Sequence, residues 1–266
     1  MQLVPFGSHL KVWRQQRKLS QLDLALQAEV SQRHVSWLET GRSQPSRSMV
    51  IRLAEALEIP LRERNPLLGS AGFAPIYRES ELDAEHMAPV ESALMQILDH
   101  HMPMPALVVN RWWQLKMTND AADQLLAVLG GEQLWQRVDP SGNRSLALLT
   151  LHPKGLRPLI SNWREAAPAF IQRVRQDALA AGNPQAQADL EQLLNLVGGL
   201  PEAPAVQPLL PMLPLELSLG STKLSLFSVI STFGTPQDIT VDELRIESFF
   251  PTDEVTRQFF EQMSTA

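Results

Sequence analysis

The stretch LSQLDLALQAEVSQRHVSWLETGR, residues 19 to 42, decides the fold of the N-terminal part of the chain. It contains two short segments with apolar residues at helical spacing: Leu22, Leu24, Ala25 and Ala28 in the first, and Val35 and Leu38 in the second. Ser20 and Ser31 precede these segments as predicted N-caps, and Gly41 is a predicted helix stop. The stretch therefore predicts a helix, a tight turn and a second helix.

Two short helices with narrow apolar stripes need neighbours, and the flanking sequence supplies them. Residues 8 to 17 predict a helix with Leu10 and Trp13 on one side, and residues 46 to 58 predict another. A short fifth helix is expected near Leu61 to Leu68. The sequence thus predicts an all-α, lambda-repressor-like domain over residues 1 to 72.

The second helix leaves polar side chains on its outer face, where residues four apart align. Gln bonds adenine, Arg bonds guanine and Ser is permissive, so this face fits the DNA major groove. Residues beside the helix are placed to meet phosphates, which fixes register without reading sequence. The predicted DNA-binding residues are Gln21, Ser31, Gln32, Arg33, Ser36, Trp37, Arg42 and Ser43. Two alternatives stay open: Trp37 in the domain core, or a helical domain that binds no DNA.

Charge supports this division of the chain. Residues 1 to 72 hold ten Lys and Arg against six Asp and Glu, a net charge of +4. Residues 73 to 266 hold thirteen against twenty-three, a net charge of −10. A positive domain on a negative body is expected when only one end approaches double-stranded DNA.

Three segments resemble the Cro/C1-type helix-turn-helix of the Xre family of bacterial and phage regulators: LSQ-x2-LA at 19 to 25, VSQ at 30 to 32 and LETGRSQPS at 38 to 46. The resemblance covers about residues 6 to 65 and implies binding to paired half-sites as a homodimer. It also implies an ion pair between Glu39 and an Arg of the first helix, here Arg14. The family usually has Gly in the inter-helix turn, where this chain has Glu29, and a non-Gly residue there costs about 1 kcal/mol.

A second domain is expected over residues 89 to 266, after a linker over 73 to 88 rich in charge and punctuated by Gly and Pro. It begins with a helix over 89 to 101, which either connects the domains or pairs with its copy in a dimer. The remaining expected elements are a β-hairpin over 106 to 118, helices over 120 to 129, 131 to 137, 145 to 151, 156 to 180 and 185 to 197, a Pro-rich connection over 201 to 214, strands near 213 to 219, 223 to 233 and 243 to 249, and a short helix from Thr252. These predict a PAS-like α+β domain with a five-stranded antiparallel sheet around an apolar cavity.

This half resembles the ligand-binding domain of MmyB-like regulators over about residues 88 to 264. The resemblance is carried by Asn110-Arg111-Trp112-Trp113 with Thr118-Asn119, by LHPKGLRPLISNW at 151 to 163, and by STFGTPQDITVDELRIESFFPTDE at 231 to 254. It implies a PAS-like fold and a small, apolar or fatty-acid-like ligand.

The candidate ligand-binding residues are Trp112, Trp113, His152, Arg157, Asn162, Trp163 and Phe170. Arg157 or His152 would pair with a carboxylate head group, and Trp163 and Phe170 would line an acyl tail, since such sites are mostly apolar with few polar anchors. In a strand, the adjacent Trp112 and Trp113 would face opposite sides. The alternative is that His152 caps a helix end, Arg157 lies on the surface and Trp163 is core.

The sequence argues against catalysis, membrane insertion and cofactors. It has no Cys, no P-loop, no G-x-G-x-x-G and no Ser in a G-x-S-x-G setting, so no enzyme is expected. Adjacent histidines such as His100 and His101 diverge on a helix, so no metal site is expected, although His86 and Asp99 lie nearby. No signal peptide or apolar run of about 18 residues is present, so we expect a cytoplasmic protein.

Three functions remain. The leading hypothesis is a sequence-specific DNA-binding transcriptional regulator that senses a small apolar ligand. The second is a constitutive DNA-binding protein whose second domain only dimerises or recruits a protein partner. The third, a fused acyl-processing enzyme, needs a nucleophile that the sequence does not offer.

Overall fold

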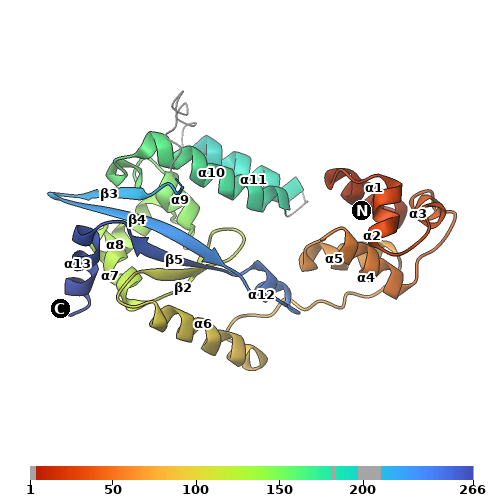
Figure 1. Ribbon diagram of the computed structural model, residues 1–266, viewed down its shortest axis with the longest axis horizontal. Helices are drawn as coiled ribbons and strands as arrows, with labels where there is room; N and C mark the ends of the chain where they lie inside the picture. The colour runs from red at the N-terminus through yellow and green to blue at the C-terminus, as the bar shows by residue number, and fades with distance from the viewer. Residues whose placement is uncertain (1–3, 181–183, 197–210, 266) are drawn as a thin grey trace. The chain divides into compact units, whose positions relative to one another are not determined.

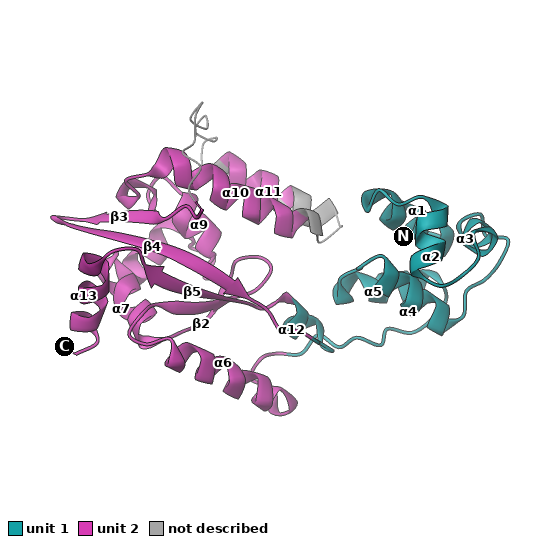
Figure 2. Ribbon diagram, viewed as in Figure 1, with its two compact units in different colours: residues 1–80, 235–242 teal, residues 81–234, 243–266 magenta. Residues whose placement is uncertain are grey.

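The computed structural model describes residues 4–180, 184–196 and 211–265. The chain forms two compact units (Figure 2). Unit 1 contains residues 1–80 together with 235–242, and unit 2 contains residues 81–234 and 243–266. The domains predicted from sequence, 1–72 and 89–266, are continuous stretches of chain. They did not assign the segment 235–242, which lies within the second predicted domain, to unit 1.

Unit 1 is built from helices α1 to α5: Phe6–Gln16, Gln21–Gln27, Gln32–Glu39, Arg47–Ala56 and Leu61–Ser70. Ser20 caps α2 in a reciprocal capping box with Asp23, and the Ser31 hydroxyl accepts a hydrogen bond from the His34 N–H at the start of α3. Leu24 and Ala25 of α2 are buried, as predicted. Leu22 is 50% exposed, so its predicted place on the buried stripe was wrong. It lies two residues, or about 200°, from Leu24 around the helix axis.

The short helix α12, Ile239–Glu243, begins within the segment that belongs to unit 1. The Ile239 N–H donates to the Arg78 carbonyl at 2.8 Å, and the Thr240 hydroxyl donates to the Ser80 carbonyl at 2.7 Å. The Asp242 carboxylate accepts a hydrogen bond from the Leu61 N–H at 3.2 Å. These contacts attach the segment to α5 and the chain that follows it.

Unit 2 is organised by one antiparallel sheet with strand order β2-β1-β5-β4-β3. The strands are β1 (Ala106–Val109), β2 (Leu115–Thr118), β3 (Leu215–Leu219), β4 (Thr222–Ser231) and β5 (Arg245–Pro251). The turn between β3 and β4 passes through Gly220 with φ 61°, a left-handed conformation that suits glycine. The expected five-stranded α+β, PAS-like domain is confirmed.

Alternating side chains of the sheet pack into different cores on its two faces. On one face, Ala106, Val108 and Ile246 pack with Leu94 and Leu98 of α6, Ala88–His100, which lies along the sheet (Figure 1). The core of the other face includes residues from four further helices and the C-terminal helix. These helices are α7 (Asp120–Val128), α8 (Gly131–Val138), α9 (Leu146–Leu151), α10 (Trp163–Ala180) and α13 (Glu254–Met263), with α11 (Pro184–Leu196) beside α10.

Two sequence-based expectations for unit 2 were wrong. The helix expected over 156–180 begins only at Trp163, because a 3-10 turn over Arg157–Leu159, with Pro158 inside it, and an extended Ile160 precede it. Trp112 and Trp113 do not lie in a strand, since β2 begins at Leu115 and Trp113 has φ 59°. The Pro-rich connection expected over 201–214 lies mostly outside the described residues. Among the helices that the structure describes, none is long and apolar enough to span a membrane.

Candidate DNA-binding surface and ligand cavity

The outer face of α3 presents the predicted base-reading residues. Gln32 and Arg33 are exposed, and Trp37 is 36% exposed, so Trp37 is not part of the core. The Arg33 guanidinium carbon lies 4.5 Å from the Trp37 ring centroid. This cation–π contact favours a position of the guanidinium over the Trp37 ring. Ser36, the residue before Trp37 in α3, is half-buried.

Behind this face, a buried ion pair fixes α3 against α1. Arg14 donates from Nε to Glu39 Oε1 at 2.6 Å and from Nη2 to Oε2 at 3.1 Å, which confirms the predicted pair. Glu39 also accepts a hydrogen bond from Gln21 Nε2 at 2.7 Å. The hydrogen bond to Glu39 is the main reason why the pKa of Arg14 is raised. The side-chain amide of Gln21, which was predicted to contact phosphate, therefore donates a hydrogen bond to the ion pair.

Each of the helices α2 and α3 is followed by a turn that contains a residue in the left-handed conformation. Glu29 has φ 53° in the inter-helix turn, where the Xre resemblance implies glycine, and Gly41 has φ 73° after α3. Arg42 is exposed beyond this turn, and its backbone N–H, like that of Ser43, donates to the Trp37 carbonyl. The predicted DNA-binding residues thus lie on α3 or at its two ends, except Gln21 on α2. Their contacts with DNA stay predictions.

Unit 2 contains an apolar cavity of about 380 Å³ between the sheet and the helices of its larger core. Leu107, Leu217, Leu226 and Phe249 line it from the sheet. The helices and loops contribute Ala122, Leu125, Leu126, Leu129, Leu146, Thr150, Leu156, Ile160, Trp163, Ala166, Ala167, Ala169 and Phe170. Its volume lies within the range of small-molecule sites, and its lining is mostly apolar.

Few polar groups face this cavity. Glu247 on β5 is buried at 7% exposure, and burial raises the pKa of its carboxyl, although a hydrogen bond from Ser228 and the charge of Arg173 oppose this shift. Ser228 and Arg173 also line the cavity. The Trp163 indole N–H is buried without a hydrogen-bond partner. An unpaired buried donor is unfavourable.

The structure brings Trp163 and Phe170 to this cavity and places Trp112 and Trp113 elsewhere. Both of the latter line a second, more polar depression of about 430 Å³ with Arg111, Asp139 and Asn143. Trp113 still touches the cavity wall, because its ring packs edge-on against Phe170 with centroids 4.9 Å apart. The Trp113 indole also donates to Asp177 at 3.1 Å, and burial raises the pKa of that carboxyl.

The other three predicted ligand residues are not among those that line the cavity. His152 follows α9, and its Nδ1 accepts a hydrogen bond from the Lys154 N–H, while burial lowers the pKa of the imidazole. The Arg157 guanidinium lies 5.0 Å from the Trp163 ring centroid. Asn162 joins β3 to the start of α10, donating to the Pro214 carbonyl and accepting from the Glu216 N–H. A ligand role for these three stays a prediction.

Sequence reasoning missed Glu247 and Arg173. The signal for Glu247 was strand alternation: residues 247 and 249 share one face of β5, and Phe249 packs on the larger core. A carboxyl group at such an inward position is unusual. No sequence signal identifies Arg173, whose place depends on the docking of α10.

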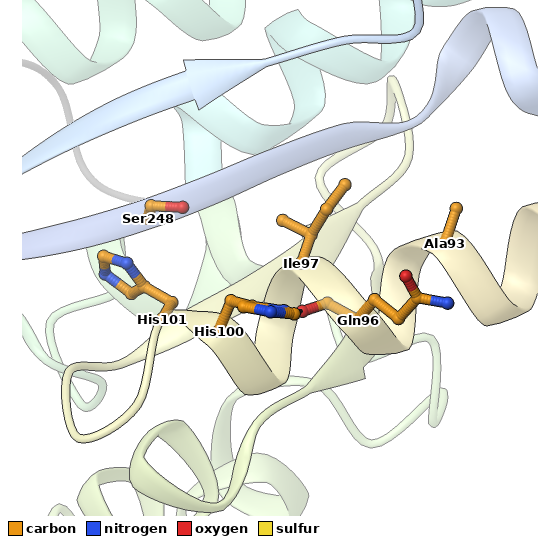
Figure 3. A pocket seen from close by; sticks show the side chains of 6 residues that line it. All are labelled: Ala93, Gln96, Ile97, His100, His101 and Ser248. Carbon is orange, nitrogen blue, oxygen red and sulfur yellow. Dashed lines mark hydrogen bonds between the residues drawn. The ribbon is translucent and has the colours of Figure 1, made fainter.

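Beside α6 lies an open groove of about 450 Å³ formed with β5 (Figure 3). Its polar rim includes His100, His101 and Ser248. His101 Nε2 lies 2.7 Å from the Phe249 carbonyl, and His100 Nδ1 lies 2.6 Å from the Gln96 carbonyl. Within the parts of the chain that the structure describes, no group of three or more His, Asp or Glu side chains could hold a metal ion.

The helix-turn-helix unit and the cavity-bearing α+β unit together define a transcription regulator with a ligand-binding domain. Comparison with protein families agrees: a helix-turn-helix domain family matches residues 5–67, and the MmyB-like transcription regulator ligand binding domain matches residues 90–263. The second match covers more than half of the chain, so this protein belongs to the MmyB-like transcription regulators. No curated protein matches the chain.

Proposed function

We propose that this protein binds double-stranded DNA sequence-specifically through α3 and that a small apolar, fatty-acid-like molecule in the cavity of unit 2 changes that binding. A ligand can shift DNA affinity only if it binds the two DNA-binding states with different affinity. The cavity supplies a place for the ligand, and the exposed face of α3 supplies the DNA contact.

The apolar cavity of about 380 Å³ carries this proposal. A domain that served only as a scaffold would gain stability by covering this apolar lining with side chains, because apolar surface left in contact with water is unfavourable. The lining is almost entirely aliphatic and aromatic, with Glu247 and Arg173 as its charged residues. This composition favours an alkyl chain over a nucleotide or a sugar.

Mass spectrometry of the purified protein tests the proposal directly. Native spectra are compared with denatured spectra, and an organic extract of the same sample is analysed for small molecules. We expect a stoichiometric mass that is lost on denaturation, or a rise in melting temperature with added decanoic acid that follows its saturation. A bare mass with no thermal shift for any alkyl compound would contradict ligand sensing.

We also propose that the protein acts as a homodimer. One α3 reads one short stretch of major groove, and helix-turn-helix dimers place two such helices on paired half-sites. Met95 and Ile97 of α6 and Val229 of β4 are 46%, 40% and 46% exposed, which offers apolar surface for a second copy. Sedimentation equilibrium tests this: a monomer at all concentrations, with and without operator DNA, would contradict it.

The same exposed apolar residues favour the second candidate function, a constitutive DNA-binding protein whose unit 2 only dimerises or recruits a partner. The two functions differ in one measurement. In the leading proposal, a compound that raises the melting temperature also changes the dissociation constant for operator DNA. In the second, DNA affinity stays constant at every ligand concentration.

A further inference from the structure

The short helix α12 contains the point where the chain passes from unit 1 to unit 2. Residues 235–242 belong to unit 1, and Glu243, the last residue of α12, belongs to unit 2 (Figure 2). Within unit 1, the Asp242 carboxylate accepts a hydrogen bond from the N–H of Leu61, the first residue of α5. A change in the position of Glu243 is therefore passed to Asp242 through a single peptide bond.

Glu243 is held within unit 2 by a buried ion pair. Arg111 Nη1 donates to Glu243 Oε1 at 2.7 Å, and the two side chains are 6% and 8% exposed. A buried charge that loses its partner is strongly unfavourable, so a displacement of one side chain displaces the other. The Arg111 guanidinium also lies 4.9 Å from the Trp112 ring centroid, a second contact that favours its position.

Arg111 lies in the turn between β1 and β2, and hydrogen bonds within this turn make it rigid. The Asn110 side-chain oxygen accepts from the Trp112 and Gln114 N–H groups, both at 3.0 Å. The Trp113 N–H donates to the Asn110 carbonyl at 2.9 Å. Trp113 has a left-handed backbone, φ 59°, which a bulky residue keeps only where its surroundings fix it. A displacement of Trp113 therefore displaces Arg111 as well.

The same turn contacts the wall of the apolar cavity at two points. The Trp113 ring packs edge-on against Phe170, and the Trp113 carbonyl accepts a hydrogen bond from the Leu146 N–H at 2.7 Å. Phe170 and Leu146 both line the cavity. A molecule that fills the cavity packs against these two residues and limits their motion, which also restrains Trp113.

We propose that Arg111 is a positioning residue through which an occupied cavity stabilises the N-terminus of α5. This inference rests on the proposed function, because it describes how the same cavity regulates the DNA-binding unit. The occupant restrains Trp113, and the rigid turn then keeps Arg111 on Glu243. The adjoining Asp242 in turn stays on the Leu61 N–H. In the empty protein this cap opens more often.

The order of α5 matters for the DNA-reading helix. Helix α5 packs against α1 and α4. Helix α1 holds α3 through the buried ion pair between Arg14 and Glu39. A better ordered α5 therefore supports the helix that positions α3. An occupied cavity differs in this way from an empty one in the state of the DNA-binding unit, which is what a ligand needs in order to shift DNA affinity.

Hydrogen–deuterium exchange of a peptide covering residues 61–70, in the full-length protein, tests this coupling without a ligand. Arg111→Met replaces the guanidinium with an unbranched apolar side chain, and we expect the peptide to exchange about threefold faster, the size of a partly lost N-cap. Phe260→Leu is the matched control, because Phe260 of α13 is fully buried and does not line the cavity. It should destabilise unit 2 without changing exchange of this peptide.

A cycle with Asp242 separates the coupling from a general loss of stability. If Arg111 acts through the Asp242 cap, Arg111→Met should speed exchange of residues 61–70 in the wild-type background but not in an Asp242→Ala background. Equal effects in the two backgrounds would overturn the proposal, and so would wild-type exchange in folded Arg111→Met. Far-UV circular dichroism reports the folding of each variant. Glu243→Gln, which weakens the same pair and carries the same expectation, serves if Arg111→Met does not fold.

Decanoic acid then tests the link to the cavity, with its binding followed by the melting temperature. At saturation we expect residues 61–70 to exchange about threefold more slowly in wild type and at an unchanged rate in Arg111→Met. Binding without this change in wild type, or the same change in the variant, would overturn the coupling while the cavity stands as a ligand site. If neither decanoic acid nor any other alkyl compound binds, the proposed ligand function itself fails.

Discussion

The Asp242 carboxylate accepts a hydrogen bond from the backbone N–H of Leu61 at 3.2 Å, although 181 residues separate them in the chain. Leu61 is the first residue of α5, and the preceding Pro60 has no side chain that caps the helix. Asp242 therefore supplies the cap that the local sequence lacks. A carboxylate at a helix N-terminus also interacts favourably with the helix dipole.

Asp242→Ala should destabilise α5 by about 0.5 to 2 kcal/mol, the usual effect of removing an N-cap side chain. Hydrogen–deuterium exchange of a peptide covering residues 61–70 measures this, and we expect faster exchange in the variant. Asp242→Asn is the control because its side-chain oxygen still accepts the Leu61 hydrogen bond, so its effect should be smaller. Equal exchange in wild type and Asp242→Ala would show that the contact does not support α5.

The helix-turn-helix could be predicted from sequence because its signals are local. The caps Ser20 and Ser31 lie next to the helices that they start, and the Arg14–Glu39 pair followed from a family pattern. The Asp242 cap could not be predicted in this way, since no periodicity links residues so far apart. Local patterns also fail where the backbone leaves the regular regions. Trp113, with φ 59°, looked like a strand residue and instead lies at the end of the turn between β1 and β2, where its N–H donates to the Asn110 carbonyl.

The ligand cavity was predicted less completely for the same reason. Trp163 and Phe170 were expected there because aromatic residues lie among apolar runs, and both line the cavity. His152 and Asn162 sit in the same sequence segment, but their side chains are used by the Lys154 N–H and by β3. Which polar side chain turns inward depends on how the sheet and α10 pack together, and composition does not determine that packing.

Arg33→Ala should weaken binding to a specific DNA site by about 1 to 3 kcal/mol and relax the preference at one base position. The guanidinium lies over the Trp37 ring, and this contact favours one direction of the side chain before DNA binds. The operator is first selected from random DNA with wild-type protein, and the variant is then assayed on all single-base changes of that site. Arg52→Ala is the matched control, since Arg52 is an exposed arginine of α4 outside the predicted DNA-binding residues. An unchanged base preference would remove Arg33 from the reading role.

Arg42→Ala should weaken binding to all sequences alike, because an exposed Arg beyond the end of α3 is placed to contact phosphate. Each phosphate contact releases counterions, so the slope of log affinity against log salt concentration should become shallower by about 1. Affinities for operator and random DNA, measured over a salt series, test this. A change in base preference instead would make Arg42 a base reader.

The stability of unit 2 should fall with rising pH because of Glu247. Burial raises the pKa of this carboxyl above its ordinary value of 4.5 in the folded protein. Above that pH the unfolded chain has released the proton while the folded chain still holds it. The folded state then binds more protons, and stability decreases with pH until the folded-state pKa is passed.

The Glu247→Gln variant has no group that titrates at this position. The part of the fall in stability with rising pH that Glu247 causes should therefore be absent from it. Urea unfolding of both proteins over about pH 5 to 8 measures the difference, and we expect wild type to lose stability relative to the variant as pH rises. Other carboxyl groups with raised pKa, such as Asp177, remain in both proteins and largely cancel. Ser228→Ala provides a second check: Ser228 hydrogen-bonds to Glu247 and lowers its pKa, so its removal should extend the decline to higher pH. Parallel pH curves for wild type and Glu247→Gln would mean that Glu247 ionises in the folded protein as it does in the unfolded chain.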